Sequence, residues 1–240
     1  MKKIKRLGLI SILGSLMLCI GLFAACNTNN NENNGDNNDT SPFTYTYKEQ
    51  DDCYLVKAKN KDIAGEIVIP STYNGKKVIL ADSAFSRCSK ITSVTIPDSV
   101  TTISHDAFFN CSSLISISIP DSVTSIDYSA FGACVSLVSV TIPDSVTSIG
   151  NSAFSNCTAL ASVILGTNVT SIGSAAFKDN SSKYVHTKVY YKGTKDDWSK
   201  ITMSISDAFV TYFFSAEQPT ESGYYWHYDN NGNVEVWPTT

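Results

Sequence analysis

Histidine and charged residues are scarce in this sequence. The three histidines, His105, His186 and His227, lie far apart and none belongs to an H-E-x-x-H motif. Charged residues make up 17% of the chain, its many serines include no G-x-S-x-G elbow, and no glycine-rich phosphate loop is present. These absences argue against a zinc protease, a serine hydrolase and a nucleotide-binding enzyme. We therefore expect no catalytic residue, no cofactor and no metal site.

The seven cysteines do not form the C-x-x-C pairs that are typical of zinc sites. Four of them follow one another at intervals of 23 residues, as Cys88, Cys111, Cys134 and Cys157. Stacked units would hold these side chains parallel, which is a poor geometry for a disulfide. We therefore expect a ladder of buried free thiols. Cys53 is interpreted as a half-buried strand residue, with a disulfide or an intermolecular role as the alternative.

The same interval of 23 residues appears in two other columns. An Ala-Phe pair begins at residues 84, 107, 130, 153 and 176, and an Ile-Pro pair begins at residues 96, 119 and 142. Columns that share one register predict a solenoid of stacked units, in which no unit buries its apolar side alone. The phenylalanines should then form one continuous interior column, made of Phe85, Phe108, Phe131, Phe154 and Phe177.

Within a unit, apolar and polar residues first alternate, as in Ser139-Val140-Thr141-Ile142. This alternation predicts a strand with one buried face. Pro143 ends the strand because it has no N–H for the ladder. Val146 and Ile149 then indicate a short return, and the segment around Phe154 is expected to be a single helical turn.

The pattern L-x-x-V-x-I-P-x-x-V-x-x-I-x-x-x-A-F-x-x-C resembles the 23-residue leucine-rich repeat of the BspA type over residues 63–193. The resemblance implies an α/β solenoid with a parallel strand sheet on its inner face and short helical turns outside. It also implies that a column of Cys or Asn binds the backbone of the loops between strands. That column reads Cys88, Cys111, Cys134, Cys157 and Asn180. Lys183 stands where the next Leu is expected, so the pattern weakens there.

Residues 1–25 have the pattern of a secretory signal, with four basic residues among the first six and an apolar segment after them. Ala24-Ala25-Cys26 resembles the bacterial lipobox, although Phe23 departs from the usual Leu. We expect lipidation of Cys26 and anchoring in the cell membrane, on its extracellular side. A plain signal peptide or an uncleaved anchor is the alternative. No later apolar run approaches the about 18 residues of a membrane-spanning helix.

Residues 26–42 are rich in asparagine and contain no apolar residue to bury after Cys26, so we expect a disordered tether. Without the leader the chain carries 14 basic and 22 acidic side chains. This balance argues against nucleic acid as a partner and leaves the lipid anchor as the only expected contact with the membrane.

The two ends of the repeat region are expected to carry β-hairpin caps. Residues 43–193 are assigned to the solenoid with its N-terminal cap, in which residues 44–47 and 54–57 form a hairpin over the first strand edge. Lys188-Val189-Tyr190-Tyr191 is expected to be the last parallel strand. Residues 194–240 form the C-terminal cap, with a short helix after Thr194 and a hairpin around an Asn-Gly turn.

Three sets of residues are candidates for binding. The inner face would present small hydroxyl side chains, which could bind a glycan or an extended protein or else form a neutral spacer: Ser93, Thr95, Ser116, Ser118, Ser139, Thr141 and Ser162. Tyr225, Trp226 and Tyr228 either stack on a sugar or peptide or fill the core of the cap. The column of Asp98, Asp121 and Asp144 either shares a cation such as calcium or consists of solvated turn residues.

The resemblance and the leader together predict a non-catalytic lipoprotein of the cell surface. Its expected partners are a host or bacterial surface protein or a glycan, and its expected role is adhesion. A structural spacer of the envelope without a specific ligand is the second hypothesis. A degraded or specialised enzyme is the third.

Overall fold

The computed structural model describes residues 41–178, 187–203, 210–220 and 222–238, all within one compact unit that spans Thr40–Thr240. The predictions for the signal peptide, the tether, Cys26 and Asn180 lie outside the described residues.

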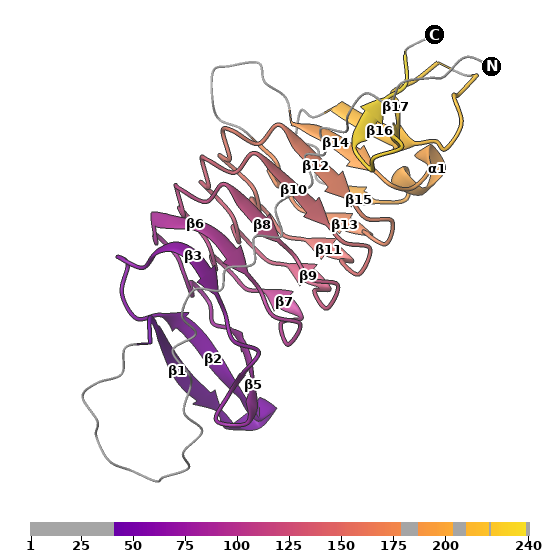
Figure 1. The fold of residues 1–240 in the computed structure, drawn as a ribbon. Helices are drawn as coiled ribbons and strands as arrows, with labels where there is room; N and C mark the ends of the chain where they lie inside the picture. The colour runs from indigo at the N-terminus through magenta and orange to yellow at the C-terminus, as the bar shows by residue number, and fades with distance from the viewer. Residues whose placement is uncertain (1–40, 179–186, 204–209, 221, 239–240) are drawn as a thin grey trace, which may run out of the picture. The chain divides into compact units, whose positions relative to one another are not determined.

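The first strands of successive repeats lie side by side in parallel along the stack (Figure 1). They are β3 (Ala64–Val68), β6 (Lys90–Thr95), β8 (Ser116–Ser118), β10 (Ser139–Ile142), β12 (Ser162–Leu165), β14 (Lys188–Tyr191) and β16 (Val210–Phe214). The register follows the repeat, with Ser93 opposite Ser116 and Ser139 opposite Ser162. Because alternate residues of a strand point to opposite faces, Val140 and its counterparts are buried while the hydroxyl residues face solvent.

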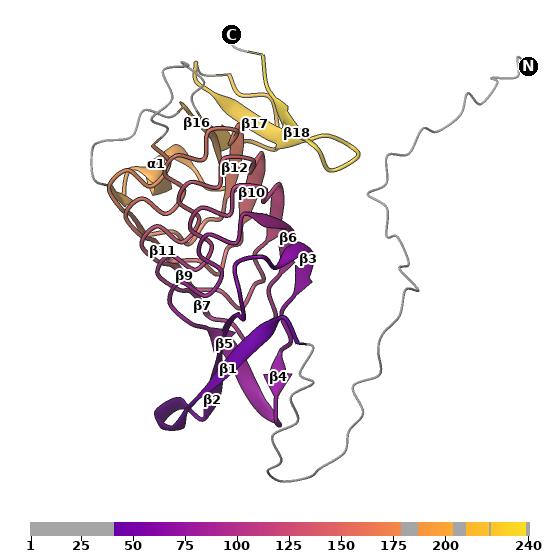
Figure 2. The same cartoon turned by 90° about the vertical axis from the view of Figure 1, so that its left-hand side faces the viewer.

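The return segments form a second parallel sheet on the other side of the core (Figures 1 and 2). It consists of β7 (Thr102–Ile103), β9 (Ser125–Ile126), β11 (Ser148–Ile149), β13 (Ser171–Ile172) and β15 (Thr202–Met203). In each of the first four of these strands the isoleucine is buried and its polar neighbour is half-buried. The repeat is therefore a coil with two strands, and its apolar side chains fill the space between the two sheets.

The segments around the phenylalanines, expected to be helical turns, are not helical. Their alternate N–H groups donate to the next repeat instead of to the same turn, as Phe108 does to Ala130 (2.8 Å) and Asn110 to Gly132 (2.7 Å). Two residues per turn adopt a positive φ, for example Asp106 (53°) and Asn110 (56°). Hydrogen bonds between repeats thus replace those of a helix, because an isolated turn of this length gains little from its own.

The phenylalanine column is confirmed as a continuous interior stack. The rings of Phe85, Phe108, Phe131, Phe154 and Phe177 are all buried, and consecutive centroids lie 5.4, 5.4, 5.0 and 5.4 Å apart. Neighbouring planes are within 14° of parallel. Phe43 closes the N-terminal end of the column with an edge-on contact at 6.0 Å to Phe85. The interval of 23 residues therefore brings one ring per coil into the same position.

The cysteine column binds the backbone of the neighbouring turn. The thiols of Cys111, Cys134 and Cys157 donate to the carbonyl oxygens of Phe85, Phe108 and Phe131 at 3.2, 3.2 and 3.1 Å. The described cysteines, which include Cys53 and Cys88, are buried and free. Each of these carbonyl groups also accepts from the cysteine N–H of its own turn, as Phe85 does from Cys88 at 3.0 Å, so the thiol is a second partner that ties neighbouring turns together.

At the N-terminal end, β1 (Phe43–Lys48) and β2 (Cys53–Ala58) pair antiparallel across the short 3-10 helix η1 (Glu49–Asp51). They continue through β5 (Lys76–Leu80) to β4 (Thr72–Tyr73) in one sheet. Phe43 and Val56 of the hairpin are buried in the same core as the repeats. The hairpin therefore shares its apolar face with the first repeat.

At the C-terminal end the parallel sheet continues beyond β14, so the expectation that Lys188–Tyr191 is the last parallel strand is wrong. β16 pairs parallel with β14, and β17 (Tyr225–Tyr228) pairs parallel with β16. β18 (Val234–Val236) then pairs antiparallel with β17. The segment between β14 and β15 contains the one-turn helix α1 (Lys195–Trp198), where the Thr194 hydroxyl accepts from Asp197 N–H at 3.1 Å.

Among the described residues, η1 and α1 are the helical segments, and neither is long and apolar enough to cross a membrane. The chain is therefore a mostly-β solenoid of about six turns with a leucine-rich-repeat fold, and the helical part of the α/β expectation is corrected. The reason is the inter-repeat hydrogen bonding of the turns described above.

Candidate binding site

The predicted inner-face residues lie together on the solvent side of the first-strand sheet. We call the surface formed by Ser93, Thr95, Ser116, Ser118, Ser139, Thr141 and Ser162 the hydroxyl face. Ser93 and Ser162 are half-buried and the other members are exposed. Because the strands are in register, the hydroxyls form two rows that run along the stack.

The hydroxyl face ends in aromatic residues toward the C-terminus. In one row, Thr141 lies opposite Ile164, and the row continues through Tyr190 to Tyr212. Tyr190 and Tyr212 are buried there because Trp226 of β17 covers them in a second, smaller apolar cluster. In this row, open polar surface is thus limited to the strands from β6 to β10, whereas in the other row Ser162 lies opposite the exposed Lys188 of β14.

The sheet under the hydroxyl face is interrupted between β8 and β10. These strands belong to neighbouring coils, joined by Val138 N–H donating to Ile115 at 3.3 Å, yet no ladder pairs them. The pairs β6–β8, β10–β12 and β12–β14 are regular, and the β3–β6 pair is continuous apart from a register shift between Gly65 and Glu66. At the end of β12 the Gly166 N–H donates to Ile142 at 3.0 Å, whereas Pro143, at the same place in β10, has no N–H to offer Ile119.

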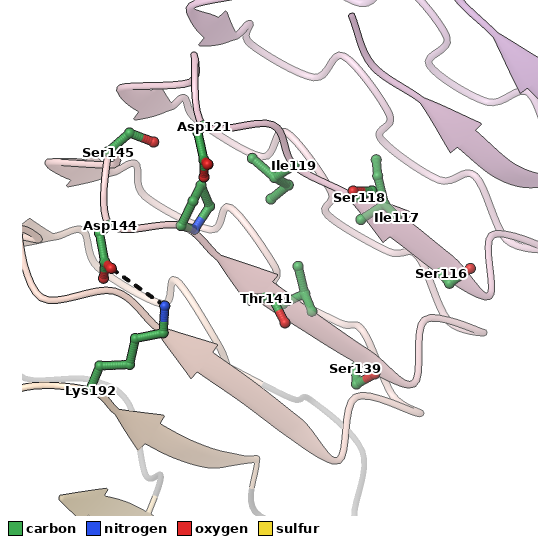
Figure 3. Close-up of a pocket in the computed structure, with 12 residues that line it drawn as sticks. Ser116, Ile117, Ser118, Ile119, Asp121, Ser139, Thr141, Asp144, Ser145 and Lys192 are labelled. Carbon is green, nitrogen blue, oxygen red and sulfur yellow. Dashed lines mark ion pairs between the residues drawn. The ribbon is translucent and has the colours of Figure 1, made fainter. Parts of the chain in front are cut away.

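A hollow of about 590 Å³ lies over this interruption (Figure 3). Its walls are the hydroxyl residues of the two strands, Ser116, Ser118, Ser139 and Thr141. Asp121, Asp144 and Lys192 lie at the turn end of the strands. Ile117 and Ile119 beneath the hollow are slightly more exposed than their counterparts Val140 and Ile142 in the next strand. The hollow thus combines a polar wall with a small apolar floor.

Ser145, which also lines the hollow, has a buried hydroxyl oxygen with no hydrogen-bond partner. The equivalent serines of the two preceding repeats are satisfied. Ser99 donates to Val78 at 2.6 Å, and Ser122 donates to Val100 at 2.7 Å. The hydrogen bond that satisfies these serines is therefore absent at Ser145, in the repeat that contains the interruption.

This difference predicts opposite outcomes for two identical substitutions. Ser122→Ala should lower the free energy of unfolding by about 1 kcal/mol, because it removes a hydrogen bond and leaves the Val100 carbonyl without that partner. Ser145→Ala should leave stability unchanged or raise it slightly, because it removes a buried hydroxyl that binds nothing. Urea denaturation of both variants measures the difference. Equal losses would show that the Ser145 hydroxyl is satisfied in solution.

The charged residues of the hollow are arranged unequally. Lys192 Nζ lies 3.5 Å from Asp144 Oδ2, and Asp144 Oδ1 accepts from the Thr167 N–H at 2.9 Å. Asp121 is exposed on the neighbouring turn. Asp98, the third member of the predicted acidic column, does not line the hollow. Within the described parts of the chain, no three acidic, histidine or cysteine side chains are grouped as a metal ion would require.

The three aromatic residues proposed for the C-terminal cap do not share one surface. Trp226 is fully buried, and its indole N–H donates to the Tyr191 carbonyl at 2.9 Å. Tyr225 is half-buried and packs against Phe213, whereas Tyr228 is exposed. Side chains alternate between the two faces of a strand, and Tyr225 and Tyr228 are three residues apart, so they point to opposite faces. They cannot stack on one ligand together. Of the two interpretations of Trp226, core filling agrees with its position.

Sequence reasoning missed a second group of aromatic residues at the N-terminal hairpin. Tyr45 and Tyr73 stack with centroids 3.8 Å apart, and Tyr54 contacts Tyr73 edge-on at 4.9 Å. Tyr47 lies 5.2 Å from Tyr54 and is 46% exposed. Alternation along the sequence places the tyrosines of each strand on one face of that strand. It does not show that Tyr73 lies beside them, because its position depends on β5, which pairs with both β2 and β4.

Comparisons with known proteins agree with this architecture. The family profile described as BspA type leucine rich repeat region matches residues 78–192 in six copies. A leucine-rich repeat protein of T. pallidum has 28% identity and a TM-score of 0.57, over 73% of this chain and 85% of its own. A leucine-rich cell surface protein of Faecalibacterium prausnitzii has 25% identity and a TM-score of 0.48, over 81% of this chain and 59% of its own.

No protein with a curated description is similar to the chain. The family profile and the structure nevertheless agree, because the matched repeats are the coils whose Phe and Cys columns stack. Residues 78–192 of the chain form a BspA type leucine-rich repeat region.

Proposed function

We propose that this chain is a non-catalytic cell-surface lipoprotein that binds a surface protein or a glycan through its hydroxyl face and so mediates adhesion. The observation that carries the proposal is the hydroxyl face itself. Between β6 and β12 it is polar and mostly exposed, and its residues are in register within the β6–β8 pair and within the β10–β12 pair. Repeat solenoids use extended surfaces of this kind to bind partners.

The composition of the face supports a polar and repetitive ligand. Strong protein interfaces depend on a few buried Trp, Tyr and Arg anchors, and the open part of this face has none. Hydroxyl groups donate and accept hydrogen bonds, so they suit a partner with many hydroxyl or amide groups. Binding at each repeat would be weak, and several repeats together would raise the affinity by multivalency.

The anchor is proposed from the leader. Lipidation at Cys26, followed by the tether, would hold the folded part outside the membrane. Mass spectrometry of the N-terminal peptide of the chain purified from bacterial membranes tests this step. An acylated Cys26 supports the anchor, whereas an intact residue 1 contradicts it.

Binding is tested with the full chain, produced in a bacterium and purified as processed, on an array of matrix glycoproteins and glycans. We expect saturable binding to at least one class, and loss of that binding when Ser118 and Thr141 are replaced together by lysine. Thr101→Lys adds charge at an exposed position outside the hydroxyl face and is the matched control. Thermal unfolding shows whether the variants keep their fold.

The spacer hypothesis makes the opposite prediction. It expects no ligand on the array and no effect of either lysine variant, while the chain still folds and reaches the membrane. Binding that survives the Ser118 and Thr141 substitutions would move the binding site away from the hydroxyl face.

A further inference from the structure

We propose that the hollow between β8 and β10 is a saccharide-binding site that holds one neutral or amine-bearing sugar unit of a glycan. This inference rests on the binding function proposed above and assigns it a position and a ligand class. Its starting point is the one described interruption in the first-strand sheet. A uniform spacer would have no reason to lose its ladder at a single repeat.

The interruption opens the first-strand sheet between two successive coils. In a regular sheet a ladder would join the facing edges of β8 and β10, but here no ladder pairs them. A ligand that carries both donors and acceptors suits an opening of this kind.

The side chains of the hollow match the groups of a sugar. Ser116, Ser118, Ser139 and Thr141 present hydroxyls that both donate and accept, as sugar hydroxyls do. The carboxylates of Asp121 and Asp144 accept strong hydrogen bonds, and the Lys192 ammonium donates them. The volume of about 590 Å³ lies within the usual range of small-ligand sites.

Two competing ligand classes are excluded, one by the charges of the hollow and one by its geometry. Two carboxylates face one ammonium group, so a sulfated or phosphorylated glycan would be repelled. An extended peptide recognised by strand addition needs an open sheet edge and pockets for alternate side chains. The unpaired edges of β8 and β10 face each other across the hollow and are tied at one end by the bond from Val138 to Ile115, and Ile117 and Ile119 of its floor are nearly covered. A neutral or amine-bearing sugar meets neither obstacle.

The test is an array of neutral, amine-bearing and sulfated glycans probed with the full chain, followed by titration calorimetry on the strongest ligand. We expect neutral or amine-bearing glycans to bind and sulfated ones to be rejected. Thr141→Lys should weaken the affinity by at least about tenfold, because its side chain fills the hollow with a second cation. Thr95→Lys, in the same row but over the closed β6–β8 ladder, should weaken it far less.

Ser139→Ala supplies a variant in which unfolding cannot explain the result. It removes an exposed hydroxyl of the hollow, so it should weaken sugar binding without lowering the unfolding temperature. Thr101→Lys controls for added charge on the surface.

The outcomes separate this proposal from the broader one. Equal losses for Thr95→Lys and Thr141→Lys would overturn the site but leave binding by the hydroxyl face in place. Binding to proteins alone, or a preference for sulfated glycans, would overturn the ligand class. The absence of any ligand would overturn both proposals.

Discussion

Phe131→Ala is expected to lower the free energy of unfolding by about 3–5 kcal/mol, the usual loss when a buried aromatic side chain is truncated. Phe131 is fully buried, and its ring stacks on Phe108 and on Phe154, so the variant breaks the column on both sides. The turns cannot collapse into the cavity easily, because Phe131 N–H donates to Ala153 at 2.8 Å and fixes the spacing of the coils. Urea denaturation followed by circular dichroism measures the loss.

Tyr128→Ala is the matched control for this prediction. Tyr128 belongs to the same repeat, but its ring is 51% exposed. Its removal should change the free energy of unfolding by no more than about 0.5 kcal/mol, as is usual at surface positions. Similar losses in the two variants would show that the phenylalanine column does not hold the stack together.

Alkaline pH is expected to destabilise the fold through the cysteine ladder. Burial, with a smaller effect of the Cys88 thiol, raises the pKa of Cys111 from 9.0 to about 12. Burial also raises the pKa of Cys88. Hydrogen bonding with Cys157 and burial raise the pKa of Cys134 well above its ordinary value. Since the folded chain holds these protons more tightly than the unfolded chain, the ladder contributes its full stability below pH 9.

That contribution falls as the pH rises from 9 toward 12. One group loses about 1.4 kcal/mol for each pH unit in this window, so Cys111 alone accounts for a loss on the order of 4 kcal/mol. Burial raises the pKa values of Tyr190 and Tyr191 as well, which adds a loss of the same sign. Urea denaturation at a series of pH values between 8 and 12 gives the slope.

Cys111→Val identifies the source of the slope. The variant lacks a thiol that titrates and starts from a lower stability, because the Phe85 carbonyl loses the thiol and keeps the Cys88 N–H as its partner. Its free energy of unfolding should therefore fall less steeply with pH than that of the parent chain. Parallel slopes for the two proteins would contradict the assignment to Cys111.

The repeats could be predicted in detail because they are repeated. One residue type at one interval identifies a column without any knowledge of the structure, and Phe131 and Cys134 each have counterparts in neighbouring coils. The helical turns were predicted wrongly from the same segments. Sequence patterns indicate which residues are buried, but they do not show that Asn110 donates across to the next coil rather than within its own turn.

The hollow could not be predicted for a related reason. Ser116, Ser139 and their neighbours have nearly the same local sequence as the strands before and after them, and prolines follow four successive strands. Only one of the resulting junctions lacks a ladder. Whether a ladder forms between two neighbouring strands depends on how their coils stack on each other, and the sequence of one repeat does not determine this stacking.

The cap aromatics illustrate the same distinction. The sequence analysis grouped Tyr225, Trp226 and Tyr228, although alternation along residues 225–228 already places Tyr225 on the other face. The burial of Trp226 required β16 and β14 to lie beneath it. The N-terminal tyrosines needed a pairing between segments that are distant in sequence. By itself the sequence determined the repeat, its buried columns and the kinship that follows from them. The tertiary structure decided where the stack opens and which rings reach solvent, because both depend on contacts between coils rather than on the residues of any one coil.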